Sequence, residues 1–317
     1  SVIFIIALIL GVLFPANYYA MHRGYIDVAI LLPLSIATYL FIDYDFYRFR
    51  LSKDIAIALM LILAWLSRRY AIYFIIGYVA ALTVKGILVL IEKKEVKAIK
   101  YVLLHYLIIG GFSLGILLVF FRKFIVKALL TDYGGMYSAY NTPLHEKISK
   151  LVSSFGYISL IIILLVGILC WVYKRNRDNY FAFISLIIVE ISVFWKVQEM
   201  DWHHRMLINI PLFLIFMISW DFYNLDGKRV KKYLARGTVT VCSALLIINF
   251  YKSYIPLSSW SHTNAFFSSK YQPLQRWDID VLEELAEYLN SLTTGTDNMI
   301  YVAASGDILN CDILRKL

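Results

Sequence analysis

Long apolar runs with almost no charge recur along the chain, and they restrict its fold more than any other feature. The runs are roughly 14 to 22 residues long and do not alternate polar with apolar residues, as the strands of a membrane barrel do. Because 60% of the 317 residues are hydrophobic, a water-soluble fold has too little interior to bury them. We therefore expect an all-α polytopic membrane protein.

The runs predict about nine transmembrane helices. They lie near residues 2–20, 26–43, 53–67, 70–91, 101–121, 153–173, 179–196, 205–222 and 237–255. Together they make a predicted transmembrane bundle over residues 1–255, which leaves residues 256–317 as a tail.

Short connections that are rich in Lys and Arg recur at every second position between the runs. They are YDFYRFRLSK, EKKEVKAIK, YKRNRD and DGKRVKKYLAR. Positive charge keeps a connection in the cytoplasm, so the net charge of +9 reflects topology and predicts no nucleic-acid partner. We expect a multi-pass protein of the cell membrane whose tail and active site are extracytoplasmic.

The tail differs from the rest of the chain in its pattern. The stretch WDIDVLEELAEYLNSL predicts an amphipathic helix with Asp280 and Glu283 spaced as a capping box. NMIYVAAS predicts a short buried strand, and SGDILNCDIL resembles a turn into another helix. The tail is therefore expected to hold the start of a small outer α/β segment.

Titratable residues on the predicted outer side gather at the ends of the expected helices. The groups are His22, Arg23 and Asp27; Arg68 and Arg69; Asp132 to Glu146; and Glu199 to Arg205. A charge at the membrane boundary costs little free energy, so each group can be either an interfacial anchor or part of a binding site.

The Arg68–Arg69 turn is the most informative of these groups, because positive charge is expected to be scarce on the outer side. Guanidinium groups bind phosphate through paired hydrogen bonds, so the turn suits a lipid-linked phosphate. The alternative is an ion pair with Glu190 or Glu199.

His203, His204 and Arg205 form a second cationic group, which can donate to phosphate or take part in proton transfer. Neighbours on a helix point about 100° apart, so we expect at most one of the histidines to face the bundle. Adjacent histidines also lack the spacing of a helical zinc site, and no metal site is predicted.

Aromatic residues follow in the long outer loop. Tyr133, Tyr137 and Tyr140, with Asp132, suit either a wall for a sugar ring or an aromatic belt at the headgroup level. Few charges lie inside the spans: we expect Lys85 to snorkel toward the cytoplasmic boundary.

Three segments together resemble the membrane glycosyltransferases of the GT-C superfamily, in the protein-O-mannosyltransferase-like group. They are FPANYYAMHRGYIDVAILLP, SRRYAIYFIIGYVAAL and DWHHRMLINIPLFL, and the tail NMIYVAASGDILNCDIL is similar to the outer segment of some bacterial members. The resemblance covers most of the chain. It implies transfer of a sugar from a polyprenyl-phosphate carrier to a glycan, lipid or protein acceptor at the outer face, in cell-envelope polysaccharide assembly.

The resemblance also implies roles for the residues at the helix ends. The carrier phosphate would be bound by Arg68, Arg69, His203, His204 and Arg205. The sugar or acceptor cavity would be lined by His22, Arg23, Asp132, Tyr133, Tyr137, Tyr140 and Glu190. Such enzymes use a carboxylate as base, and Asp27 is the acid of the first outer loop; its place at a helix start differs from the family pattern, which implies a principal base upstream of this chain.

Two other functions remain open at this level. A lipid-linked glycan transporter or flippase predicts ionisable residues near the midplane, and a polysaccharide polymerase or ligase predicts an outer-face site on the same carriers. No cofactor is indicated, and a divalent cation is left open. Membrane lipids are expected partners in each case.

Overall fold

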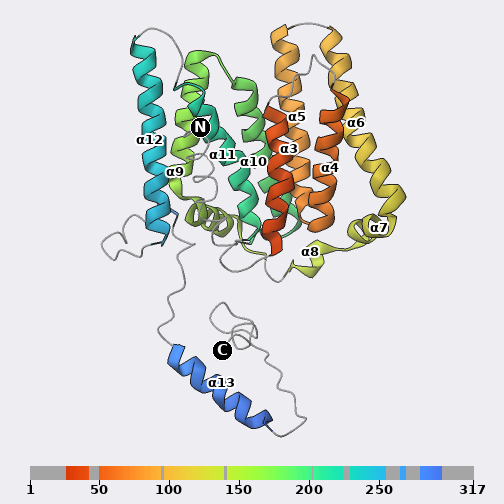
Figure 1. Cartoon of the computed structure of the whole chain (residues 1–317), viewed down its shortest axis with the longest axis vertical. Helices are drawn as coiled ribbons and strands as arrows, with labels where there is room; N and C mark the ends of the chain where they lie inside the picture. The colour runs from red at the N-terminus through yellow and green to blue at the C-terminus, as the bar shows by residue number, and fades with distance from the viewer. Residues whose placement is uncertain are drawn as a thin grey trace. The chain divides into compact units, whose positions relative to one another are not determined.

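The computed structural model describes residues 26–42, 50–93, 96–138, 141–201, 203–223, 229–254, 265–268 and 279–294 (Figure 1). The expected span at 2–20 and the expected strand NMIYVAAS lie outside these residues. Two compact units divide the chain, Ser1–Gln272 and Pro273–Leu317. The described part of the second unit is one helix, α13 (Ile279–Thr293), which confirms the amphipathic helix of the tail; an α/β segment is not supported.

Most of the described residues of the first unit are in helices, because in lipid the backbone N–H and C=O groups must form hydrogen bonds within their own segment. The elements are η1 (Ile26–Ile30), α3 (Leu31–Ile42), α4 (Leu51–Ser67), α5 (Ala71–Lys93), α6 (Val96–Phe120), α7 (Arg122–Leu130), α8 (Tyr133–Met136), α9 (Leu144–Tyr173), α10 (Arg177–Val197), η3 (His204–Ile208), α11 (Asn209–Trp220) and α12 (Arg229–Tyr254).

Five of these helices are long and apolar enough to cross a membrane: α5, α6, α9, α10 and α12. The apolar segments Asp27–Ile42 and His204–Trp220 are shorter. At about 1.5 Å per residue, a helix of the length of α4 spans about 25 Å, less than the roughly 30 Å of a hydrocarbon core. The membrane character is confirmed, and the count of nine spans is not supported.

The most extensive helix–helix contact among the described residues is that of α5 with α10. Gly77 permits this approach, since a Cβ atom there would lie 2.8 Å from the Leu186 carbonyl oxygen. Around this pair α3 packs on α4, α4 on α6, and α9 on α11 and α12. Aromatic rings fill the space between α3 and its neighbours, with Phe41 5.6 Å from Tyr78 and 5.7 Å from Phe183 between ring centroids.

A kink divides α9 at Gly156, whose φ of 67° is a left-handed conformation. The helix restarts after it, so the next backbone N–H groups have no partner within α9. Residues 265–268 supply the acceptors: Tyr157 N–H donates to Ala265 O and Ile158 N–H to Phe266 O, each at 3.0 Å. The segment after α12 is thereby fixed to the middle of α9.

Polar groups are also buried where α3 ends and α10 begins. Lys85 is 2% exposed, and its ammonium donates to the carbonyls of Phe41 and Ile42 and to Asn179 Oδ1 at 2.7 to 3.0 Å. The last carbonyls of a helix lack helical partners, so the lysine caps α3. The ammonium thus reaches the end of α3 and the start of α10, where Asp178 Oδ2 is 3.8 Å away, and the expected snorkelling toward the membrane boundary stays a prediction.

A second buried polar pair, which the sequence analysis did not anticipate, joins α4 to α6. His105 Nδ1 lies 2.8 Å from Asp54 Oδ2, and both side chains are at most 2% exposed. The sequence did hold a signal for this pair: each residue is an ionisable group inside an apolar run, and such residues rarely lie in a membrane helix without a partner.

Candidate functional site

The candidate site lies at the end of the first unit where α4 ends, α5 begins, α10 ends and η3 begins. We call this end the His203 end; it is the lower end of the bundle in Figure 1, near α7 and α8. Its polar side chains come from four separate stretches of the chain: η1, the α4–α5 turn, α8, and residues 199–205.

The first contact at this end joins η1 to the α4–α5 turn. Arg68 Nε lies 2.6 Å from Asp27 Oδ1, and the Asp27 side chain is only 10% exposed. Tyr70 lies beside this ion pair. Burial, and next the negative charge of Asp27, raise the pKa of the Tyr70 hydroxyl, so the phenol stays neutral.

Stacked rings join the turn to the two histidines. The centroid of the Tyr70 ring is 4.5 Å from that of His204, and the two imidazoles are 3.8 Å apart. Asp201 N–H donates to His204 Nδ1 at 3.1 Å, so in the neutral ring the proton is on Nε2. Both imidazoles pack beside the Tyr70 ring, so the expectation that at most one histidine faces the bundle is wrong.

His203 interacts with charged groups from three segments. Burial is the main cause that lowers the pKa of its imidazole; Arg68 and Arg205 add to the effect, while Asp201 and Asp27 oppose it. Its Nδ1 lies 3.6 Å from Asp201 Oδ2. The convergence defines what we call the rim cluster: Asp27, Arg68, Tyr70, His203 and His204.

Arg69 points to α8 instead of the rim cluster. Its Nη1 donates to the Tyr133 hydroxyl at 2.6 Å, and the guanidinium lies 5.1 Å from the centre of the same ring. Asp132 caps α8 by accepting from Gly135 N–H at 2.9 Å, and Tyr137 is exposed directly after the helix. The two arginines of the α4–α5 turn therefore have different partners: Arg68 pairs with Asp27 in the rim cluster, and Arg69 contacts Tyr133 of α8.

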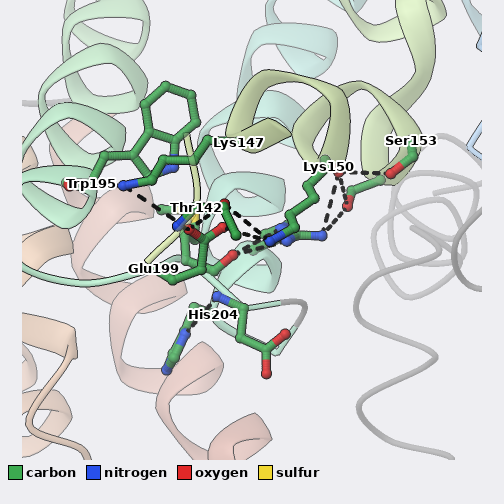
Figure 2. Close-up of polar contacts among 11 residues, drawn as sticks. Thr142, Lys147, Lys150, Ser153, Trp195, Glu199 and His204 are labelled. Carbon is green, nitrogen blue, oxygen red and sulfur yellow. Dashed lines mark hydrogen bonds and ion pairs between the residues drawn. The ribbon is translucent and has the colours of Figure 1, made fainter. Parts of the chain in front are cut away.

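Glu199 is the centre of a separate network that joins the end of α10 to the start of α9 (Figure 2). Its carboxylate accepts from Thr142 Oγ1 at 2.9 Å and lies 3.3 Å from the Lys150 ammonium. Lys147 donates to Trp195 O at 3.2 Å and is 4.0 Å from the same carboxylate. Neither arginine of the α4–α5 turn contacts Glu199, so this alternative for the arginine pair is wrong.

Arg205 is enclosed in the protein, at 2% exposure. Its guanidinium donates twice to Met200 O, at 2.9 and 3.1 Å, and also to Lys150 O and Ser154 Oγ. These bonds use the N–H groups that phosphate recognition needs. The assignment of Arg205 to the carrier phosphate is therefore corrected: the Arg205 side chain joins α9 to the segment before η3 through these hydrogen bonds.

Glu190 is likewise separate from the rim cluster. It is fully buried on α10, where Gly77 of α5 faces it, and neither carboxyl oxygen has a hydrogen-bond partner among the described residues. One helical turn further along α10, Phe194 packs against His204 with centroids 4.8 Å apart. The expected place of Glu190 in an open sugar cavity is not what the structure shows.

Three of the expected site residues, His22, Arg23 and Tyr140, lie outside the described residues. Tyr70 was missed by the sequence analysis, although it directly follows the arginine pair. Across the part of the chain that the structure describes, no three His, Cys, Asp or Glu side chains are grouped to hold a metal ion.

No family model, curated protein or solved structure matches the chain. The chemistry of the His203 end therefore carries the functional argument. A carboxylate, two guanidinium groups, a neutral phenol and an imidazole lie at one end of an apolar bundle. This combination can bind an anion and move a proton.

Proposed function

We propose that the protein is a membrane glycosyltransferase of the GT-C type, which transfers a sugar from a polyprenyl-phosphate carrier to an acceptor at the His203 end of the bundle. The observation that carries the proposal is the convergence of Asp27, Arg68 and His203 from three distant segments. The basic connections favour a cytoplasmic location for the opposite end, which supports a site at the outer face and a role in cell-envelope glycan assembly.

The phosphate of the carrier is assigned to Arg69 and His203. Arg69 is exposed and reaches the Tyr133 hydroxyl with one N–H, so other N–H groups of its planar fork remain for phosphate oxygens. His203 is 21% exposed beside the ion pair and can donate to the same group. Tyr133 and Tyr137 offer ring faces for the sugar next to Arg69.

Asp27 is assigned the role of base. Its carboxylate takes the proton from the acceptor hydroxyl, whose oxygen attacks the anomeric carbon of the sugar. The carbon–oxygen bond to phosphate breaks, and its electron pair leaves with the phosphate. Arg68 keeps the carboxylate in place through the 2.6 Å ion pair.

Binding of the carrier tests the proposal directly. We expect Arg69→Ala and His203→Ala to weaken the binding of a polyprenyl phosphate by about tenfold or more, since charge-assisted hydrogen bonds to phosphate contribute about 1.5 to 3 kcal/mol. Affinity is measured on the purified chain in detergent, with the apparent unfolding temperature as a check on folding.

The matched control is Arg122→Ala, which removes an exposed guanidinium at the start of α7. Lys231→Ala removes an exposed cation of α12. Both controls should bind like the parent. Equal affinity of Arg69→Ala, His203→Ala and the parent would show that these residues are membrane anchors.

A second candidate function, a lipid-linked glycan transporter or flippase, is favoured by the buried Asp54–His105 pair, because transporters carry ionisable groups inside their bundles. Vesicles loaded with a lipid-linked saccharide separate the two. A flippase moves the saccharide between leaflets without an acceptor, whereas a transferase consumes it only when an acceptor is present.

A further inference from the structure

Glu190 is a fully buried carboxyl on α10. Its residue exposure is 0%, and both carboxyl oxygens lack a hydrogen-bond partner among the described residues.

Close packing of two helices creates this environment. Gly77 of α5 faces Glu190, and a Cβ atom at Gly77 would lie 3.3 Å from Glu190 Cβ and 2.8 Å from Leu186 O. The backbones of α5 and α10 therefore meet at the carboxyl, with no side chain at position 77 to separate them. We call this contact the α5–α10 seam, defined by Gly77, Leu186 and Glu190.

An ionised carboxylate is unstable in such a place. Burial of an isolated charge without a counter-ion or donors costs far more than protonation of the acid, so buried carboxyls neutralise. A neutral carboxylic acid at 0% exposure still lacks a partner for its O–H, which leaves a polar group held in place by packing alone.

We propose that Glu190 is an intramembrane proton-binding site, which holds its proton while the α5–α10 seam is closed and exchanges it only when the seam opens. The ligand is a proton: the O–H bond of the acid breaks, the electron pair stays on the carboxylate, and the proton passes to water that enters the seam. The inference is independent of the proposed glycosyl transfer.

The His203 end gives the direction in which the seam opens. One turn of α10 from Glu190, Phe194 packs between Tyr73, at 4.2 Å, and His204, at 4.8 Å between ring centroids. These rings cover the seam on the side of the rim cluster. A shift of Phe194 with η3 would admit water to the carboxyl.

Infrared spectroscopy of the purified chain in phosphatidylcholine vesicles tests the site. At neutral pH we expect a carbonyl-stretch band at the high-frequency position of a carboxylic acid without hydrogen bonds. After transfer to D₂O the band should shift slowly, because the proton exchanges only through opening of the seam. Glu190→Gln, which matches the neutral acid in size, should remove the band.

Glu199→Gln is the matched control, because Glu199 is hydrogen-bonded to Thr142 and paired with Lys150. This variant should keep the band. Gly77→Ala forces the helices apart and should speed the deuterium shift at least tenfold. Absence of the band in the parent, its persistence in Glu190→Gln, or an immediate shift in D₂O would each overturn the proposal; no change of rate in Gly77→Ala would exclude the seam as the gate.

Discussion

Arg69 and Arg205 carry the same side chain at the same end of the bundle, yet their surroundings are opposite. Arg205 is 2% exposed, and backbone carbonyls and Ser154 accept its N–H groups, whereas Arg69 is exposed and stacks on Tyr133. A guanidinium that is satisfied internally has few donors left for a ligand. Exposure and existing partners therefore decide which cation at this end can bind phosphate.

His203 makes the stability of this end depend on pH. Burial lowers the pKa of its imidazole in the folded state, while in the unfolded chain the pKa is about 6.5. As the pH falls below about 6.5, the unfolded state gains a proton that the folded state does not. We expect the unfolding free energy to fall toward acid by up to about 1.4 kcal/mol per pH unit until the folded pKa is reached.

Thermal unfolding in detergent at a series of pH values measures this effect. His203→Gln cannot gain the proton, so its unfolding temperature should fall less between neutral and mildly acid pH than that of the parent. Identical pH profiles for the two proteins would show that burial of His203 does not contribute.

At the scale of elements, α9 depends on its kink. A Cβ atom at Gly156 would lie 2.5 Å from Phe266 O and 2.7 Å from the Phe267 carbonyl carbon, and φ is 67°. Both the clash and the left-handed backbone penalise any side chain. We expect Gly156→Ala to lower the unfolding free energy by more than about 2 kcal/mol and to release residues 265–268 from α9.

Gly111→Ala provides the matched control for this substitution. Nothing lies within 4 Å of a Cβ atom at Gly111 on α6, so the change should alter stability by less than about 1 kcal/mol. Thermal unfolding of the two variants under one condition makes the comparison. Equal stability of Gly156→Ala and Gly111→Ala would contradict the role of the kink.

At the scale of the whole molecule, the prediction concerns sidedness. The charge of the connections predicts that the His203 end lies outside, so a cysteine at Ser138 should react with a membrane-impermeant thiol reagent in intact cells, and one at Lys231 should not. Cys170 and Cys242 are buried and should not react with the reagent, and Cys311 is replaced by Ser in both labelling variants. The reverse labelling pattern would invert the orientation and move the rim cluster to the cytoplasmic face.

The sequence by itself determined which segments become helices. In lipid the backbone N–H and C=O groups of a segment must form hydrogen bonds within that segment. An apolar run such as 153–173 or 179–196 therefore forms a helix, whichever segments lie beside it. The amphipathic helix of the tail was likewise predicted from the helical spacing of its apolar residues, which is a local property of the sequence. Convergence of the arginine turn with the histidines was also expected, because both are charged and sit at helix ends on one side.

Only the tertiary structure decided how the polar groups are paired inside the bundle. The pairing of Asp54 with His105, the internal bonds of Arg205 and the isolation of Glu190 depend on which helix faces which. In a membrane nearly every face of a helix is apolar, so the sequence pattern carries little information on packing partners. The partners were set instead by local shape, as at Gly77, where the missing side chain brings α5 against α10.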